Sequence, residues 1–221
     1  MKPARTTHLA SPLALLIVLQ GCATAPPDRE AAVSPPVTQA SDVKRTGPAA
    51  WAVHVKAVRT LPPQAYAELD SALGLVKAEQ YERAIDAFKK LAATLPDNAI
   101  PTINLALVYK QLDKLDLAET HLKEALAIEP DSPVAGNELG LLYRKTGRFA
   151  EARAVYETTL VKYPHFAIAH KNLGVLCDLY LREYECAIDH YKTYATHAPN
   201  DKSVEIWIAD LRKRLGTKEP R

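Results

Sequence analysis

The residues able to carry out chemistry are few in this 221-residue chain, which has three cysteines and seven histidines. His165 and His170 are close in sequence, but they fall on different sides of a predicted junction between two helical units. The sequence has no glycine-rich phosphate loop and none of the HExxH, GxSxG or paired CxxC patterns that bring metal ligands or nucleophiles together. We therefore expect the protein not to be an enzyme and to hold no metal and no cofactor.

The helices that would position these residues belong to an internal repeat of the sequence. A column of alanines recurs at steps of 34, 34 and 35 residues, and a column of prolines keeps the same rhythm: Ala84, Ala118, Ala152 and Ala187; Pro96, Pro130, Pro164 and Pro199. Large apolar residues precede each alanine by three positions and follow it by four: Tyr81, Leu115, Phe149 and Tyr184; Phe88, Leu122, Tyr156 and Tyr191. Apolar residues at i, i+3 and i+7 predict one face of a helix.

A second helix is predicted upstream of each of these. It is marked by a small residue at a constant spacing of 34: Ala72, Ala106, Gly140 and Gly174. A second marker follows three positions later in the last three units, as tyrosine in two of them and cysteine in the third: Tyr109, Tyr143 and Cys177. We expect the small residues of the two helices to face each other, because close backbone approach lets helices pack tightly as a hairpin.

This pattern resembles the tetratricopeptide repeat (TPR) family, which stacks 34-residue helix–turn–helix units. The resemblance covers residues 65–201 as four repeats, 65–98, 99–132, 133–166 and 167–201. It implies an all-α fold class, an α-α superhelix (TPR solenoid) of about four repeats. Repeat four has one inserted residue within 179–183, which must widen the turn between its helices. An ordinary helical bundle with coincidental spacing is the alternative.

A final amphipathic helix follows the repeats, at 202–216. Its apolar residues share one stripe: Val204, Trp207, Ile208, Leu211 and Leu215. Stacked repeats leave their last apolar face open, so we expect this helix to cap it. Gly216 is the predicted stop, and 217–221 form a tail. A dedicated docking helix is the alternative role.

The N-terminal residues resemble a bacterial lipoprotein signal peptide, 1–22. Lys2 and Arg5 precede an apolar run, 9–19, that is too short to span a bilayer. Leu19-Gln20-Gly21-Cys22 then looks like a lipobox, which implies that the Cys22 thiol takes a diacylglycerol, with acyl chains such as palmitate, and becomes the new N-terminus. The alternative is an ordinary signal peptide cut at 23–25. Ala23 stands where aspartate would resemble an inner-membrane retention signal, so the resemblance favours the periplasmic face of the outer membrane.

Residues 23–50 are rich in proline, alanine, serine and threonine and contain no aromatic residue. They predict a disordered tether, because they bury too little apolar surface to offset ordering. Residues 51–64 form a lead-in, and Pro62-Pro63 predicts the start of the first helix. Residues 1–22 hold two basic and no acidic side chains, so the mature chain has 26 of each sign. This balance argues against a nucleic-acid partner.

The two remaining cysteines leave alternatives open. Cys177 takes the place of the buried tyrosine in its helix. Cys186 precedes the packing alanine of the next helix and is expected to lean outward. A periplasmic location allows a disulfide between them, whereas the different orientations argue against one.

The resemblance also implies a binding groove, because the first helices of TPR repeats line the concave face. Carried over position by position, the predicted groove consists of Asn104, Leu107, Lys110, Gln111, Asn137, Glu138, Leu141, Arg144, Lys145, Lys171, Asn172, Val175 and Asp178. Asparagine amides can donate to and accept from the backbone of an extended peptide. The four basic side chains can select an acidic segment or a C-terminal carboxylate. The alternative is that the asparagines serve packing and the lysines only solvate the face.

Together these features predict a lipid-anchored periplasmic scaffold or assembly factor that binds a protein or peptide and takes no small-molecule substrate. A TPR lipoprotein resembles the pilot and stability lipoproteins of type IV pili, which help a secretin ring to assemble. The alternatives are a TPR component that accompanies a TonB/ExbB/ExbD-type energy-transducing system, an outer-membrane barrel assembly factor, a regulator of a peptidoglycan enzyme, or an enzyme whose residues form no recognisable motif.

Overall fold

The computed structural model describes residues 61–216, which form a single compact unit. The predicted signal peptide, Cys22, the tether and most of the lead-in lie outside the described residues, as does the tail. Within 61–216, none of the helices is both long and apolar enough to cross a membrane.

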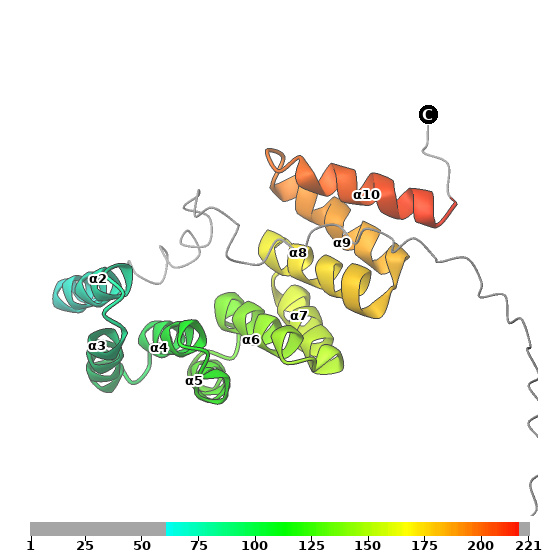
Figure 1. Ribbon diagram of the computed structural model, residues 1–221. Coiled ribbons are helices and arrows are strands. Elements are labelled where there is room, and N and C mark those ends of the chain that lie inside the picture. The colour runs from blue at the N-terminus through cyan, green and yellow to red at the C-terminus, as the bar shows by residue number, and fades with distance from the viewer. Residues whose placement is uncertain (1–60, 217–221) are drawn as a thin grey trace, which may run out of the picture. The chain divides into compact units, whose positions relative to one another are not determined.

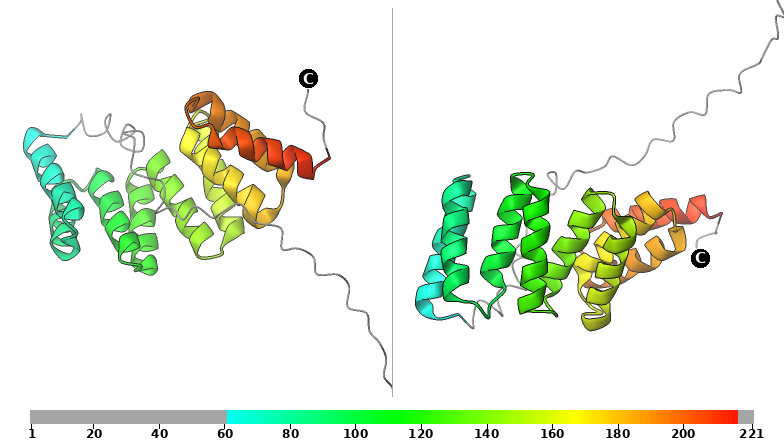
Figure 2. Two further views of the ribbon diagram at one scale, coloured as in Figure 1. Left: turned by 45° about the horizontal axis from the view of Figure 1, so that its top comes forward. Right: turned by 90° about the horizontal axis from the view of Figure 1, so that it is seen from below.

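Residues 61–216 form nine α-helices and one π-helical turn (Figure 1). They are α2 (Pro63–Lys77), α3 (Tyr81–Thr94), α4 (Ile100–Gln111), α5 (Leu115–Ile128), α6 (Pro133–Lys145), α7 (Phe149–Lys162), α8 (Ala167–Val175), η1 (Leu176–Leu181), α9 (Tyr184–His197) and α10 (Ser203–Arg214). Helices α2 to α9 pair as four hairpins, each hairpin packs against the next, and α10 packs on α9 (Figures 1 and 2). The predicted all-α superhelix of four repeats and a capping helix is confirmed.

Prolines and left-handed residues set the helix ends. Prolines stand in the first turn of α2, α4 and α6, where a missing N–H costs nothing. The turn inside each hairpin uses one residue with positive φ: Glu79, Asp113, Gly147 and Arg182. Only one of these four residues is glycine, so the sequence has no column of glycines that would mark the turn.

The core is built from large side chains of the second helices packed against small residues of the first. Phe88, Leu122, Tyr156 and Tyr191 are all at most 1% exposed. A methyl group added at Gly140 would come within 2.5 Å of Tyr156 Cε1, and one at Gly174 within 2.6 Å of Tyr191 Cδ1. In repeats three and four the small residue of the first helix therefore packs against a tyrosine ring rather than against another small residue, which corrects the predicted packing.

This contact makes a prediction about stability. Gly140→Ala is expected to lower the free energy of unfolding by about 1–2 kcal/mol, because overpacking against a buried ring outweighs the gain in helix propensity. Gly74→Ala is the matched control, since nothing lies within 4 Å of the added methyl group. It should raise stability by about 0.5–1 kcal/mol. Urea titration followed by circular dichroism measures both, and equal shifts in the two variants would contradict the packing argument.

Helix α10 caps the stack as predicted. Val204, Ile208 and Leu211 are buried, and the Trp207 ring packs against Tyr191 with the ring centroids 5.3 Å apart. Gly216 has a φ of 68° and ends the helix. The apolar stripe of α10 is thus used inside the fold.

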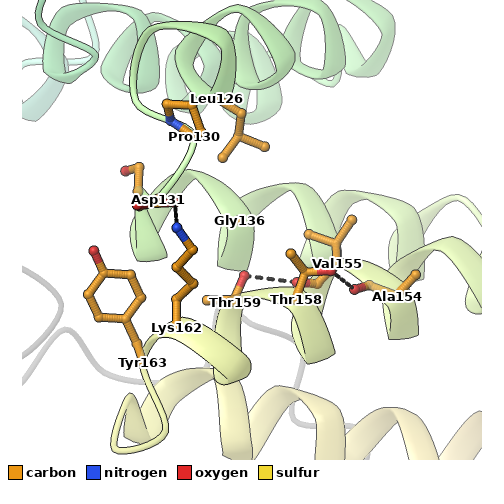
Figure 3. A pocket seen from close by; sticks show the side chains of 11 residues that line it. Leu126, Pro130, Asp131, Gly136, Ala154, Val155, Thr158, Thr159, Lys162 and Tyr163 are labelled. Carbon is orange, nitrogen blue, oxygen red and sulfur yellow. Dashed lines mark hydrogen bonds and ion pairs between the residues drawn. The ribbon is translucent and has the colours of Figure 1, made fainter.

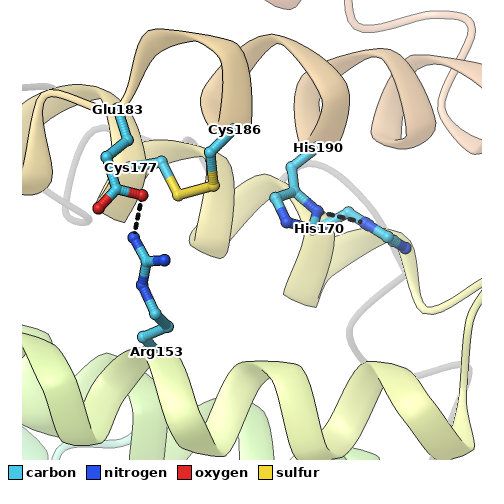
Figure 4. The surroundings of a disulfide bond; sticks show 6 residues. All are labelled: Arg153, His170, Cys177, Glu183, Cys186 and His190. Atoms are coloured by element: carbon cyan, nitrogen blue, oxygen red, sulfur yellow. Dashed lines mark hydrogen bonds and ion pairs between the residues drawn. A yellow bond between two sulfur atoms is a disulfide. The ribbon is translucent and has the colours of Figure 1, made fainter.

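The argument from orientation against a disulfide was wrong, because the structure joins Cys177 to Cys186 (Figure 4). The inserted residue of repeat four is accommodated in the π-helical turn η1. At the end of this turn the Glu183 N–H donates a hydrogen bond to Cys177 O at 2.8 Å. This turn brings the first turn of α9 beside Cys177, and the two Cα atoms lie 6.0 Å apart. Cys186 packs partly buried against the core instead of leaning outward.

Candidate functional site

The predicted groove is formed by α4, α6, α8 and η1, the first helices of repeats two to four. Its asparagines are used mainly inside the fold. Asn104 is buried, and its amide donates to Ile100 O at 2.8 Å. The Asn172 amide donates to Asn137 Oδ1 at 2.8 Å and so joins α8 to α6. These contacts support the alternative that the asparagines serve packing.

The groove lysines are neutralised by carboxylates. Lys110 pairs with Glu138 of the next repeat, and Lys145 Nζ lies 2.6 Å from Asp113 Oδ1 of the preceding one. Three further pairs join neighbouring repeats outside the groove: Arg148 to Glu119, Lys162 to Asp131 and Arg153 to Glu183. The regular spacing of basic and acidic side chains therefore ties the stack together rather than leaving a free positive face.

Lys171 belongs to a cluster that binds α8 to the capping helix. Its Nζ lies 2.7 Å from Asp201 Oδ2 and over the rings of Tyr194 and Trp207. The Asp201 carboxylate also accepts from the Tyr194 hydroxyl at 2.8 Å and the Ser203 hydroxyl at 2.5 Å. Although burial opposes ionisation, these donors hold the pKa of Asp201 well below its ordinary value. Lys171 is therefore a structural residue.

Arg144 differs from the lysines, because it forms no ion pair with any residue in 61–216. Its guanidinium lies over the Tyr180 ring, with Cζ 5.9 Å from the centroid. The Tyr180 ring in turn packs on Phe149, with centroids 4.8 Å apart. Tyr180 is 42% exposed, and its neighbour Leu179 is 38% exposed. The insertion in repeat four thus places an aromatic side chain beside Arg144, which the transfer of family positions did not predict.

The other predicted groove residues divide into three kinds. Leu107, Leu141 and Val175 are partly buried apolar side chains, and Gln111 is exposed. Asp178 is partly buried and accepts from the Tyr191 hydroxyl at 3.4 Å, and burial raises the pKa of this carboxyl. The binding role of all these residues stays a prediction.

His165 and His170 do not form a joint site. His170 Nε2 donates to Pro164 O at 3.0 Å, which leaves His170 Nδ1 to accept from His190 Nδ1 at 2.9 Å (Figure 4). Burial and the nearby His170 lower the pKa of His190 to about 4. His165 packs instead on His197, with ring centroids 5.1 Å apart. These four histidines therefore lie in two pairs within the fold, His170 with His190 and His165 with His197.

One group of three potential metal ligands occurs in the described part of the chain, formed by Cys177, Glu183 and Cys186. The disulfide removes both sulfur atoms as thiolate ligands, and the Glu183 carboxylate pairs with Arg153. This arrangement does not hold a metal ion while the disulfide is intact.

A cavity of about 290 Å³ lies between the α5–α6 connection and the outer side of α7 (Figure 3). It is lined by Leu126, Pro130, Asp131, Ser132, Gly136, Ala154, Val155, Thr158, Thr159, Lys162 and Tyr163. The hydroxyls of Thr158 and Thr159 donate to carbonyls of their own helix, and Lys162 pairs with Asp131. These polar side chains of the cavity are therefore already partnered, and we assign no ligand to it.

Comparison with known proteins decides the family. A tetratricopeptide repeat family model matches residues 69–133 and 137–202, more than half of the chain. The chain belongs to the tetratricopeptide repeat family. No curated protein matches it significantly.

Solved TPR structures have the same fold at low sequence identity. MamA has a TM-score of 0.59 and 20% identity over 69% of this chain and 82% of that chain. PilF of Pseudomonas aeruginosa has a TM-score of 0.61 and 22% identity over 68% of each chain. The Cut9 and Hcn1 hetero-tetramer of the APC/C has a TM-score of 0.58 and 22% identity over 68% of this chain and 30% of that chain. At these identities the likeness shows the fold alone. As a TPR protein, this chain is a protein-interaction scaffold.

Proposed function

We propose that this TPR protein is a non-catalytic assembly factor of the bacterial cell envelope, anchored through lipid on Cys22 to the periplasmic face of the outer membrane. Its groove would hold a segment of a component of a type IV pilus or secretin-like machine. The sequence resemblance to pilus lipoproteins favours this machine, and the likeness in fold to PilF agrees with it.

The observation that carries the proposal is that Arg144 forms no ion pair with any residue in 61–216, whereas the other basic residues of the groove are all in ion pairs. Its guanidinium lies over the exposed Tyr180 ring, and Leu141 precedes it by one turn in the same helix. Leu141 and Val175 of the groove are partly buried apolar side chains. A cation that has no ion pair within 61–216, together with apolar side chains, suits a protein segment of mixed character. The Cys177–Cys186 disulfide supports the location, because disulfides persist in oxidising compartments such as the periplasm.

Partner capture from the native envelope tests the groove. Tagged full-length protein is cross-linked in cells, purified from membranes and analysed by mass spectrometry. We expect Arg144→Glu to reduce recovery of the partner about tenfold, whereas Lys89→Glu, on the exposed face of α3, leaves it unchanged. The partner's identity separates a pilus or secretin component from the energy-transducing, barrel-assembly and peptidoglycan alternatives. Equal recovery with both variants would refute the groove assignment.

Lipidation is tested separately. Wild-type protein is expected to incorporate labelled palmitate and to sediment with the outer membrane, while Cys22→Ser does neither. Membrane sedimentation of Cys22→Ser without label would reject the anchor. A hydrolase screen on the same material tests the absence of catalysis, and activity that survives further purification would contradict it.

A further inference from the structure

The Tyr156 hydroxyl is the one buried side-chain nitrogen or oxygen in residues 61–216 that has no hydrogen-bond partner. Tyr156 lies in α7, is fully buried, and packs against Gly140 of α6. Buried hydroxyls in folded proteins are nearly always bonded, so an unpartnered one calls for an explanation. Burial raises the pKa of this phenol well above its ordinary value, and the side chains whose charges also act on it are Arg144, Glu138 and Tyr180. Arg144 follows Gly140 by four residues in α6, so its side chain leaves the same face of the helix against which the Tyr156 ring packs.

Repeat four shows what the hydroxyl lacks. Tyr191 occupies the position of Tyr156 in the next repeat, and its hydroxyl donates to Asp178 Oδ2 at 3.4 Å. The residue at the position of Asp178 in repeat three is Arg144. An arginine side chain has five N–H donors and no acceptor. At these two equivalent positions repeat three thus has two donors, where repeat four has a donor and an acceptor.

This mismatch occurs once among the four repeats. The position of Tyr156 is taken by Phe88 in repeat one and Leu122 in repeat two, which carry no hydroxyl. Glu138, the carboxylate whose charge acts on the Tyr156 phenol, is already paired with Lys110. No group within the described fold supplies the acceptor that Arg144 and Tyr156 both lack.

We propose that the Arg144 corner, formed by Arg144, Tyr156 and Tyr180, binds a carboxylate of the partner protein. Its oxygen atoms accept from the guanidinium and from the Tyr156 hydroxyl, and charge-assisted bonds of this kind are the stronger ones in proteins. The exposed side chains of Tyr180 and Leu179 then contact a large apolar side chain that lies next to the carboxylate in the partner. The inference rests on the proposed function of the groove and names the chemistry that the groove selects.

The Tyr156 hydroxyl is covered while no partner is bound, so binding requires a local shift. Arg144 and Tyr180 are the groups able to make it, because both are partly exposed and Tyr180 lies in the π-helical turn η1 rather than in a regular helix. The carboxylate comes either from an acidic side chain within a segment or from the C-terminus of a chain. Both sources present the same oxygen atoms, so the experiment has one arm for each.

The test is a titration of the full chain in detergent, with ¹³C-labelled tyrosine, followed by NMR. Three probes are used: Ac-Gly-Ala-Leu-Phe with a free C-terminus, amidated Ac-Gly-Glu-Leu-Phe, and amidated Ac-Gly-Gln-Leu-Phe as the uncharged control. At least one carboxylate probe should shift the Tyr156 ring signal and bind about tenfold more tightly than the control. A response to the first alone identifies a C-terminal carboxylate, and a response to the second alone an acidic side chain.

Variants locate the binding. Arg144→Met is expected to weaken the carboxylate probe about tenfold, because it removes the charge and the N–H donors of the guanidinium. Tyr156→Phe should weaken it about threefold or more, because it removes one O–H donor. Lys145→Met, on the same helix but paired with Asp113, should stay within about twofold. Arg144→Asp restores the arrangement of repeat four. It should abolish probe binding and yet melt at no lower temperature than Arg144→Met, since the new carboxylate accepts from Tyr156.

Two results would overturn the inference. If neither carboxylate probe shifts the Tyr156 signal, the hydroxyl is satisfied by an ordered water only. If the probes bind but their affinity is unchanged by Arg144→Met and Tyr156→Phe, the carboxylate binds elsewhere. Neither result decides partner capture from the envelope. Conversely, capture that is insensitive to Arg144→Glu together with probe binding at the Arg144 corner would reject the proposed function and leave this site standing.

Discussion

Removal of the Cys177–Cys186 disulfide is expected to lower the free energy of unfolding by about 2–3 kcal/mol. The bond closes a short loop that holds η1 and the first turn of α9. A closed loop of roughly ten residues limits the entropy of the unfolded chain by about this amount. The measurement is urea unfolding of the Cys177→Ala/Cys186→Ala double variant against wild type, both with Cys22→Ser to remove the third thiol.

Reduction supplies the control. A dithiol reductant should bring wild type close to the double variant and should leave the double variant unchanged. The loss is expected to concentrate in repeat four, because that is where the bond lies. Hydrogen exchange should therefore increase first in η1 and α9, while α4 and α5 stay protected. If the reductant does not change the urea midpoint of wild-type unfolding, the stabilising role of the disulfide is contradicted.

The fold was predictable because a repeat states the same constraint four times. Ala84 and its three equivalents are all fully buried, and so are the ring or leucine positions that follow them. Repeat one departs from the family pattern, with Glu68 where an aromatic residue is usual and Ser71 where a leucine is usual, but the other three copies keep the pattern visible. The capping helix was predictable for a related reason, because an amphipathic stripe beyond the last repeat has one open face to cover.

The site was less predictable, because it depends on how this chain departs from the repeat. The pairing of Lys110 with Glu138 crosses from one repeat to the next, and so does that of Lys145 with Asp113. Neither can be read from a position within a single repeat. Tyr180 reaches Arg144 only because the inserted residue becomes a π-helical turn. The same turn brings Cys186 beside Cys177. The position of a residue within the TPR pattern predicts which way its side chain points, but contacts with neighbouring repeats decide whether that side chain is available to a partner.

Asp201→Asn is expected to lower the free energy of unfolding by about 2 kcal/mol at pH 7. The carboxylate accepts from Lys171, Tyr194 and Ser203, and hydrogen bonds to charged groups contribute about 1.5–3 kcal/mol in favourable cases. The amide keeps the shape but loses the charge that Lys171 needs. Helix α10 should loosen first, because Asp201 lies two residues before its first residue, Ser203, and bonds to it.

The same carboxylate makes an acid-sensitive contribution with a defined sign. Its pKa is lower in the folded chain than in the unfolded chain, so the unfolded state takes up the proton first as the pH falls. The stabilisation is therefore complete above the ordinary pKa of about 4 and is lost progressively below it. Asp201→Asn lacks this component. Wild type should lose more stability than the variant between pH 5 and pH 3, so the gap between them narrows on acidification.

Asp189→Asn is the matched control, because Asp189 is exposed on α9 and its pair with Lys192 is long, at 3.4 Å. It should change stability by less than about 0.5 kcal/mol. Thermal unfolding across the pH series, followed by tryptophan fluorescence, reports on Trp207 beside the cluster. If Asp201→Asn and Asp189→Asn unfold alike at pH 7, then Lys171 is not tied to the cap. Lys171 would then be free to face a partner, and the groove would carry a second available cation next to Arg144.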